Sequence, residues 1–350
     1  MQYSQSARSS LGPEPPEAHT TVTAMQEFRT HELELPAELA GMRLDQALAR
    51  ALPQYSRARL QSWIALGAVR VEGRVPRARE KVWGGERVHV EARLEAEGIV
   101  APEALPLEIV HEDRDLFAIN KPPGLVVHPG AGNRAHTLQN ALLALDPRLA
   151  LVPRAGLVHR LDRATSGLLV VARTVEAHAR LVAALAAREI ERRYLAICAG
   201  VMTGGRTIDE PIGRHRTLRT RMAVRSDGRP AVTHVRVVRR FRAHTFVEAE
   251  LETGRTHQIR VHLAHVGYPI LGDPVYGGRR RIPPAAGPAL LEALGVMQRQ
   301  ALHAARLQLM HPRTGRVMRW EAPLPADMQR VLGALEEDLS EAGRLGRGGP

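Results

Sequence analysis

Cysteine, lysine and aromatic residues are all scarce in this chain of 350 residues. The single cysteine, Cys198, excludes an internal disulfide and any zinc site that needs several cysteines. Lys81 and Lys121 are the only lysines, so arginine supplies nearly all of the positive charge. The chain also lacks a run of ~18 apolar residues and a basic-then-apolar signal peptide. We therefore expect a cytoplasmic protein with no membrane contact, and a core position for Cys198.

What the chain does have is an ordinary globular composition and a surplus of positive charge. Hydrophobic residues make up 44% and charged residues 25%, and the length allows two domains plus tails. The net charge is +12, but residues 1–40 carry −4, residues 41–100 carry +4, and the remainder carries +12. Clustered cations release counterions when they bind a phosphate backbone. The charge distribution therefore favours a polyanionic partner.

The first hundred residues divide into a tail, a small module and a linker. Residues 1–38 mix Ser, Pro, Glu and Thr without apolar periodicity, which predicts a flexible acidic tail. Residues 41–92 show helical spacing, a good N-cap at Ser56, a helix-ending Gly67 and short alternating strands, which together predict a compact α/β module. Prolines in residues 93–106 discourage a continuous helix and favour a linker.

Residues 107–325 predict a second, larger domain. Strand-like runs at 192–198, 232–241 and 245–251 mix with helix-like segments, without the regular strand–helix–strand rhythm of a parallel sheet. That mixture favours an α+β fold with a mixed, mostly antiparallel sheet. Residues 326–350 predict a short amphipathic helix near Met328 to Leu339 and a disordered tail from Ala342.

A polar loop between two apolar runs contains the first candidate for chemistry, Asp162, with arginines on both sides. Loops between strands often carry functional side chains. Taken alone, however, Asp162 is better interpreted as a surface ion-pair partner. In the same way Tyr194, at the start of a strand, suits a core position, and Arg260, in a helix that begins after Thr256, suits a helix surface or a phosphate contact.

Two other patterns suggest chemistry that the rest of the chain does not support. Gly130-x-Gly132-x-x-Ala135 is a partial dinucleotide fingerprint, but Pro129 precedes it and no further strand–helix repeats follow. His257, His262 and His265 lie on or near one helix, without the acidic or thiolate company of a metal site. A zinc nucleobase deaminase is excluded because Cys198 alone cannot supply its cysteine ligands. We expect no nucleotide cofactor and no metal.

The module from Met42 to Val90 resembles the S4-type RNA-binding domain, on the segments "RLDQAL", "YSRARLQSWI", "GAVRVEGR" and "GGERVHV". The resemblance implies that RNA lies against the second helix and the following hairpin. An excess of arginine on a small module is also the electrostatic pattern of a nucleic-acid surface. The RNA-binding candidates in this module are Arg43, Arg57, Arg59, Arg70 and Arg74.

The larger domain resembles the RluA-type pseudouridine synthases, on "INKPPGLVVHPG", "GLVHRLDRATSGLLVVART", "RRYLAI" and "TGRTHQIRVHLAHVGYPILGDPVYG", which occur in family order. The resemblance implies that Asp162 is the catalytic carboxylate, that Arg260 pairs with it, and that Tyr194 stacks on the base. Arg255 is a nearby alternative to Arg260. The remaining RNA-binding candidates are Lys121, Arg160, Arg163, Arg255 and His257.

The implied reaction converts uridine to pseudouridine by breaking the N1–C1′ bond and forming a C5–C1′ bond. It involves no redox change and no new atoms, so it requires neither a metal nor a nucleotide cofactor. The target nucleotide must leave its stack to reach Asp162, which could attack C1′, add to C6 or abstract a proton. By resemblance the substrate is large-subunit (23S) ribosomal RNA or its assembly precursor, at the intersubunit-bridge stem-loop, helix 69. We expect a monomer; the alternative is a non-catalytic RNA-binding factor in ribosome assembly.

Overall fold

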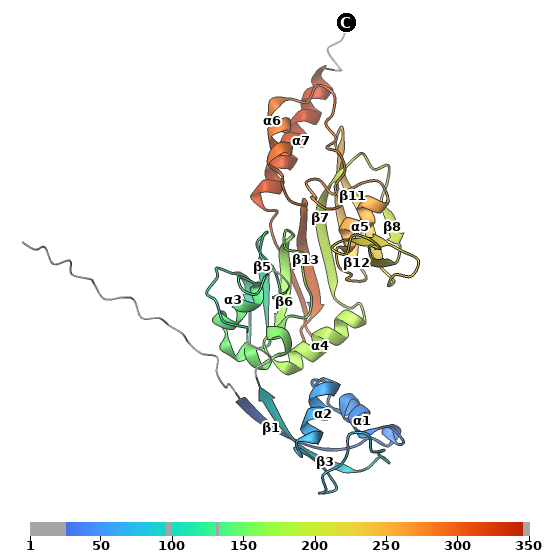
Figure 1. The fold of residues 1–350 in the computed structure, drawn as a ribbon. Helices are drawn as coiled ribbons and strands as arrows, with labels where there is room; N and C mark the ends of the chain where they lie inside the picture. The colour runs from blue at the N-terminus through green and yellow to red at the C-terminus, as the bar shows by residue number, and fades with distance from the viewer. Residues whose placement is uncertain (1–25, 96–99, 131–132, 346–350) are drawn as a thin grey trace, which may run out of the picture.

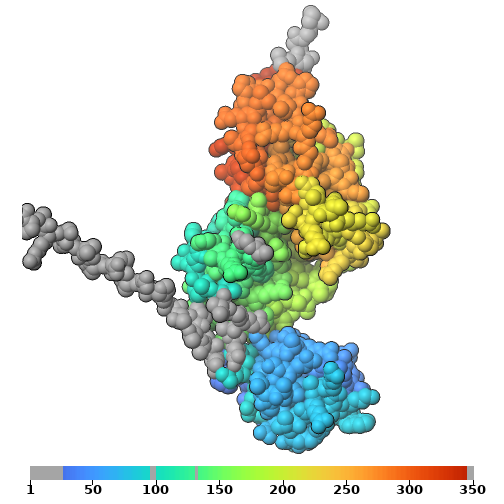
Figure 2. Space-filling model, in the orientation of Figure 1, coloured from blue at the N-terminus to red at the C-terminus, as the bar shows by residue number. Residues whose placement is uncertain are grey.

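The computed structural model describes residues 26–95, 100–130 and 133–345. Within these ranges the chain forms a small N-terminal lobe and a larger lobe built on one long sheet (Figure 1). The two lobes are also distinct in the space-filling view (Figure 2). Arg29 in the small lobe pairs with Glu176 in the large one. Of the helices in the described ranges, none is both long enough and apolar enough to cross a lipid bilayer.

The small lobe packs two helices on a three-stranded antiparallel sheet of order β1-β3-β2. Ser56 caps the second helix by accepting the Arg59 N–H, and Gly67 follows the helix with a positive φ of 74°, so both predicted helix ends are confirmed. Leu48, Leu60 and Val90 fill the core between helices and sheet. The elements are β1 (Gln26–Glu34), α1 (Leu44–Ala51), α2 (Arg57–Ala65), β2 (Val69–Val71) and β3 (Arg87–Glu95).

The predicted flexible tail over residues 1–38 is wrong at its C-terminal end, because β1 pairs with β3 along its whole length. Backbone hydrogen bonds hold this strand, and most of its side chains are polar, so the sequence shows no apolar periodicity there. The Nε2 atom of His31, a residue of this strand, lies 2.7 Å from the Tyr55 hydroxyl oxygen. The lobe also extends to Glu95, into the predicted linker of residues 93–106. Residues 1–25 and 96–99 lie outside the described residues.

The large lobe is organised by a nine-stranded sheet of order β4-β5-β6-β13-β7-β12-β11-β8, with β14 added to β13. Only the β13–β6 pair is parallel, which confirms the predicted mixed, mostly antiparallel α+β fold. Its strands are β4 (Glu108–Glu112), β5 (Leu116–Lys121), β6 (Ser166–Ala172), β7 (Glu191–Ala199), β8 (Arg206–Asp209), β11 (Val232–Arg240), β12 (His244–Leu251), β13 (Leu302–Met310) and β14 (Val317–Glu321). The other elements are α3 (Leu138–Leu145), α4 (Val175–Ala186), the pair β9 (Ile212–Arg214) and β10 (Met222–Val224), α5 (Gln258–His265), α6 (Pro288–Val296) and α7 (Ala326–Leu345).

The C-terminal helix α7 is longer than predicted and belongs to the large lobe. Met328, Val331 and Leu335 are buried in the same core as α6, and the buried Asp338 pairs with Arg242 at 2.8 Å. The predicted disordered tail from Ala342 is wrong as far as Leu345, because α7 continues to that residue. Residues 346–350 lie outside the described residues.

The loop that carries Asp162 begins at Gly156, where the backbone leaves no room for a side chain. A Cβ on Gly156 would overlap the carbonyl oxygen of Ala172, and its φ of +81° disfavours any L-residue. We expect Gly156→Ala to lower the free energy of unfolding by roughly 3 kcal/mol, from strain and overpacking together. Gly124→Ala is the matched control, because its φ is +91° but no atom lies within 4 Å of the added Cβ. Urea denaturation should show a clearly smaller loss for the control; equal losses would contradict the steric account.

Candidate active site

Asp162 lies on a loop whose neighbouring residues are anchored in the core. Leu161 and Thr165 are buried on either side, and Thr165 N–H donates to the carbonyl oxygen of Asp162 to close a turn. His159 Nε2 accepts the Val170 N–H at 3.0 Å, and burial, reinforced by Arg192, lowers the pKa of this imidazole to about 3. The neutral His159 ring therefore helps to hold the loop, while the Asp162 side chain stays half-buried and open to a cavity of about 360 Å³.

Arg260 reaches Asp162 from α5, and both residues line the cavity. Its Nη1 donates to Asp162 Oδ2 at 2.9 Å, while its Nε and Nη2 donate to the two oxygens of Asp273 at 2.7 and 2.9 Å. Burial opposes the charge of this guanidinium, but its hydrogen bonds to Asp273 and the nearby negative charge of Asp162 outweigh this effect and raise the pKa of Arg260. Arg255 donates instead to the carbonyl oxygen of Pro230. Arg260, not Arg255, is thus the partner of Asp162.

Asp273 fixes this arrangement and was missed by the sequence reasoning. Its Oδ1 also accepts the N–H groups of Val275 and Tyr276, so the carboxylate is held by the turn that follows it. Burial raises the pKa of Asp273, but Arg260 more than offsets this and the pKa is lowered. The available signal was the "GDPVYG" turn, in which an acid precedes a proline next to the arginine-bearing helix. A bidentate pair of this kind restricts the guanidinium to one orientation.

Tyr194 lies on β7 and lines the same cavity. Its cross-strand neighbours are Ala249 on β12 and Ala304 on β13, which both have small side chains. Burial raises the pKa of the Tyr194 phenol, with Arg192 opposing and Asp162 reinforcing the shift. The ring is therefore a neutral aromatic surface at physiological pH, suited to stacking against a planar base.

His257 stands beside the carboxylate rather than on the outer surface. Its Nε2 lies 3.9 Å from Asp162 Oδ1, and its Nδ1 lies 2.8 Å from the Tyr276 hydroxyl, which also accepts the Met222 N–H. Burial lowers the pKa of His257, and Asp162 only partly opposes this, so the neutral ring is favoured. The backbone of His257 is left-handed, with φ of 59°, at the start of α5. His257 is therefore one of the side chains that surround Asp162.

Lys121 is not an RNA-binding residue, contrary to the sequence prediction. Its side chain is fully buried, and its Nζ donates to the carbonyl oxygens of Pro122, Leu125 and Arg163 at 2.8, 3.0 and 3.1 Å. Burial lowers the pKa of the amine to about 7, against the attraction of Asp162. No phosphate can reach this amine. Lys121 instead ties the 122–125 turn to the Asp162 loop, because the strand that carries it is buried on both faces.

The other predicted RNA-binding arginines lie at the surface in two places. In the small lobe, Arg43 and Arg57 both donate to the buried Asp45. Their own side chains stay partly exposed to solvent. Arg70 and Arg74 are exposed and Arg59 is half-buried, and Arg74 pairs with Glu80. In the large lobe, Arg160 and Arg163 are exposed beside Asp162, and Arg163 donates to the carbonyl oxygen of Gly124.

Gly130 of the dinucleotide pattern and His262 of the histidine pattern are both engaged with other groups of the protein. Gly130 and Asn133 exchange backbone hydrogen bonds in a tight turn, which occupies the Gly130 N–H; Gly132 lies outside the described residues. His262 is buried, with Nδ1 2.9 Å from the Thr233 hydroxyl and Nε2 2.9 Å from the carbonyl oxygen of Glu210. Its two nitrogens are therefore engaged with protein groups, as the imidazole of a structural histidine is.

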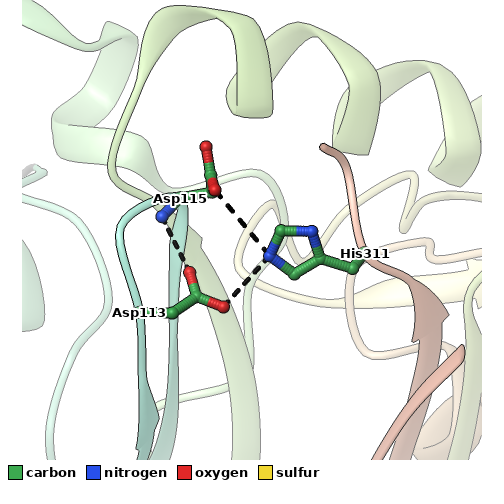
Figure 3. Close-up of side chains that lie close together, drawn as sticks. All are labelled: Asp113, Asp115 and His311. Carbon is green, nitrogen blue, oxygen red and sulfur yellow. Dashed lines mark hydrogen bonds and ion pairs between the residues drawn. The ribbon is translucent and has the colours of Figure 1, made fainter. Parts of the chain in front are cut away.

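A different cluster, Asp113, Asp115 and His311, has donor atoms close enough to surround a cation (Figure 3). His311 Nδ1 accepts the N–H groups of Arg313 and Thr314, so its proton resides on Nε2, which faces Asp113 Oδ2 at 3.0 Å. A protonated nitrogen cannot coordinate a metal. The cluster is thus better described as a hydrogen-bonded network that ties the β13–β14 turn to the β4–β5 turn.

This network should contribute stability that depends on pH. Burial opposes the charge of Asp113, but hydrogen bonds from His111, Asp115 N–H and Leu116 N–H outweigh it and hold the pKa at about 2. A carboxyl whose pKa is depressed by folding stabilises the fold above its ordinary value, and loses that contribution as pH falls through the depressed value. We expect Asp113→Asn to be less stable than the wild type at pH 6, with the difference shrinking between about pH 4 and pH 2. A difference that stays constant across urea titrations in this range would contradict the prediction.

Comparison with known proteins identifies the families that this chain resembles. The family model for RNA pseudouridylate synthase matches residues 115–265, and that for the S4 domain matches residues 42–88. Ribosomal large subunit pseudouridine synthase D of Pseudomonas aeruginosa is 53% identical over 314 residues, which cover 90% of this chain and 98% of the relative. The protein of the same name from Escherichia coli K12 is 54% identical over 302 residues, 86% of this chain and 93% of the relative.

Solved structures give the same result. Human RNA Pseudouridylate Synthase Domain Containing 1 is 26% identical with a TM-score of 0.51, covering 72% of this chain and 98% of that one. Human RNA Pseudouridylate Synthase Domain Containing 4 is 28% identical with a TM-score of 0.52, covering 65% and 93%. The chain belongs to the RluA-type family of RNA pseudouridine synthases and carries an S4 domain in front of its catalytic domain.

Proposed function

We propose that this enzyme converts uridines of large-subunit ribosomal RNA to pseudouridine, with Asp162 as the catalytic carboxylate. The observation that carries the proposal is the Asp162–Arg260 pair, which opens into a cavity also lined by Tyr194. The ribosomal substrate is supported by the printed names of the relatives and by the match to the S4 domain. By resemblance, the target is the intersubunit-bridge stem-loop, helix 69.

The geometry gives each oxygen of Asp162 a different surrounding. Oδ2 accepts the Arg260 hydrogen bond, whereas Oδ1 lies 3.9 Å from His257 Nε2, beyond hydrogen-bond distance. Oδ1 is therefore the oxygen left for the substrate. Attack on C1′, addition to C6 and proton abstraction all need an ionised oxygen beside the flipped nucleotide, and Arg260 supports that charge in each case.

Tyr194 and the cavity walls supply the rest of the binding site. A uridine that leaves its stack loses the contacts of its neighbouring bases, at a cost of roughly a few kcal/mol. Stacking on the Tyr194 ring replaces part of that contact, because aromatic–base stacking contributes about 1–3 kcal/mol per base. Tyr194 lines the cavity and its cross-strand neighbours are both alanines, which supports a base lying against this ring.

Tritium release from RNA labelled at uridine C5 tests this function, since forming the C5–C1′ bond displaces the C5 hydrogen. Purified protein is expected to release tritium from a large-subunit RNA fragment that contains the stem-loop, in proportion to the uridines modified. The control is the same fragment with its loop uridines replaced by cytidines, labelled in its remaining uridines. No release from either the fragment or the whole RNA would refute the proposal; release from the control alone would refute only the target.

A further inference from the structure

Three consecutive residues that lead into the catalytic loop have a left-handed backbone. Arg154 has φ of 53° and ψ of 35°, Ala155 has φ of 51° and ψ of 39°, and Gly156 has φ of 81°. The left-handed region is unfavourable for L-residues other than glycine, and occasionally asparagine and aspartate. Such strain persists only where the surrounding structure imposes it, and it concentrates at functional sites. Two strained residues in a row therefore call for a functional explanation.

The surrounding structure holds this turn firmly. Ala155 is buried and its N–H donates to the carbonyl oxygen of Val152, and Leu157 N–H donates to that of Arg154 at 3.2 Å. Gly156 packs directly on the backbone of Ala172, and Leu157 bridges to Val171 in β6. With Ala155 directed into the core, the turn leaves the Arg154 side chain exposed.

Arg154 lines the same cavity as Asp162, together with Arg160 and His128. Among the described residues, neither Arg154 nor Arg160 donates a side-chain hydrogen bond or forms an ion pair with the protein. The other arginines of this cavity, Arg192, Arg255 and Arg260, all donate to protein oxygens. The two exposed guanidiniums thus form the part of the cavity wall whose positive charge is still available to a ligand.

His128 does not add to this charge. Burial lowers its pKa, a hydrogen bond with Gln139 opposes the shift, and the nearby Arg160 and Arg154 lower it further. The ring is neutral at physiological pH, so an anion at this wall meets the two arginines alone. Guanidinium groups suit phosphate because they can donate two parallel hydrogen bonds to it.

We propose that Arg154 binds a backbone phosphate of the RNA next to the flipped uridine, and that the left-handed turn holds its guanidinium in place for that contact. The inference rests on the proposed function, because it takes RNA as the substrate. The uridine base and sugar enter the cavity toward Asp162, and the phosphates on either side stay at its mouth. Because Arg154 touches the backbone and not the base, it acts on binding and position rather than on bond-making.

Arg154→Gly removes the guanidinium without disturbing the turn, because glycine adopts the left-handed conformation readily. We expect a melting temperature equal to or above that of the wild type, and KM for RNA raised about tenfold with a much smaller change in kcat. The slope of log affinity against log salt should also fall by about 0.7–0.9, the loss of one phosphate contact. A purely structural role for Arg154 would not move that slope.

Arg114→Ala is the matched control, since Arg114 is also exposed but lies in the β4–β5 turn, outside this cavity. It should keep the wild-type KM and salt slope. If Arg154→Gly keeps them too, or if both variants lose affinity equally, the inference is overturned while the proposed function stands. If the wild type forms no pseudouridine, the proposed function fails, and the salt slopes of RNA binding by the three proteins still decide whether Arg154 contacts phosphate.

Discussion

Asp162→Asn is expected to lower the single-turnover rate of pseudouridine formation by on the order of 10⁴-fold, while RNA affinity changes little. Asparagine has nearly the same shape and keeps an oxygen to accept the Arg260 hydrogen bond of 2.9 Å. It has no negative charge, however, so it can neither act as nucleophile nor take up a proton. The measurement is product formation at saturating enzyme, with RNA affinity determined separately by filter binding.

The control for this variant is Asp227→Asn, which removes an exposed carboxylate that is also paired with an arginine, Arg225. It should retain the wild-type rate, because its charge lies on the surface and the ion pair there is weak. A rate for Asp162→Asn within tenfold of the wild type, with folding and RNA binding intact, would remove Asp162 from the chemistry.

Arg260→Met is expected to lower both stability and activity, because it leaves two carboxylates without their shared cation. Removing one partner of a buried ion pair typically costs about 3–5 kcal/mol of unfolding free energy. The rate should fall by roughly 10²–10³-fold, since Asp162 loses the donor that orients it. Urea denaturation and the single-turnover assay measure the two losses separately. A variant with normal stability and normal rate would contradict the arrangement described here.

A second variant and the pH dependence of stability test the role of Arg260 further. Arg260→Lys keeps the charge but cannot donate to Asp273 and Asp162 together in the same fork geometry, so its rate should lie between those of the wild type and Arg260→Met.

Arg260 also holds down the pKa of Asp273, which burial alone would raise. That contribution is present above the ordinary pKa of aspartate and lost in acid, so the stability gap between wild type and Arg260→Met should narrow as pH falls below about 4.

The sequence predicted the features that depend on local patterns or on motif order. The cap at Ser56 and the α+β class follow from residue patterning, and the structure confirms both. Asp162, Tyr194 and Arg260 were selected through the family resemblance, and the structure brings them to one cavity from a loop, a strand and a helix. Without the motifs, each of the three has an ordinary structural interpretation.

The features that the sequence did not predict depend on contacts between distant segments. Asp273 was missed because its importance lies in a bidentate contact with Arg260. Lys121 looks like a surface cation until its three carbonyl partners are known. β1 is held by backbone pairing, which leaves no apolar pattern, and the left-handed conformation of Arg154 has no signal in residue type because arginine ordinarily avoids it.

Mapping pseudouridines in the large-subunit ribosomal RNA of a strain that lacks this protein tests the central claim most directly. The strain is complemented with the wild-type protein or with Asp162→Asn, at equal protein levels. The account predicts that specific pseudouridines disappear in the deletion strain, return with the wild type, and stay absent with Asp162→Asn. A complete set of pseudouridines in the deletion strain, or their return with Asp162→Asn, would contradict it.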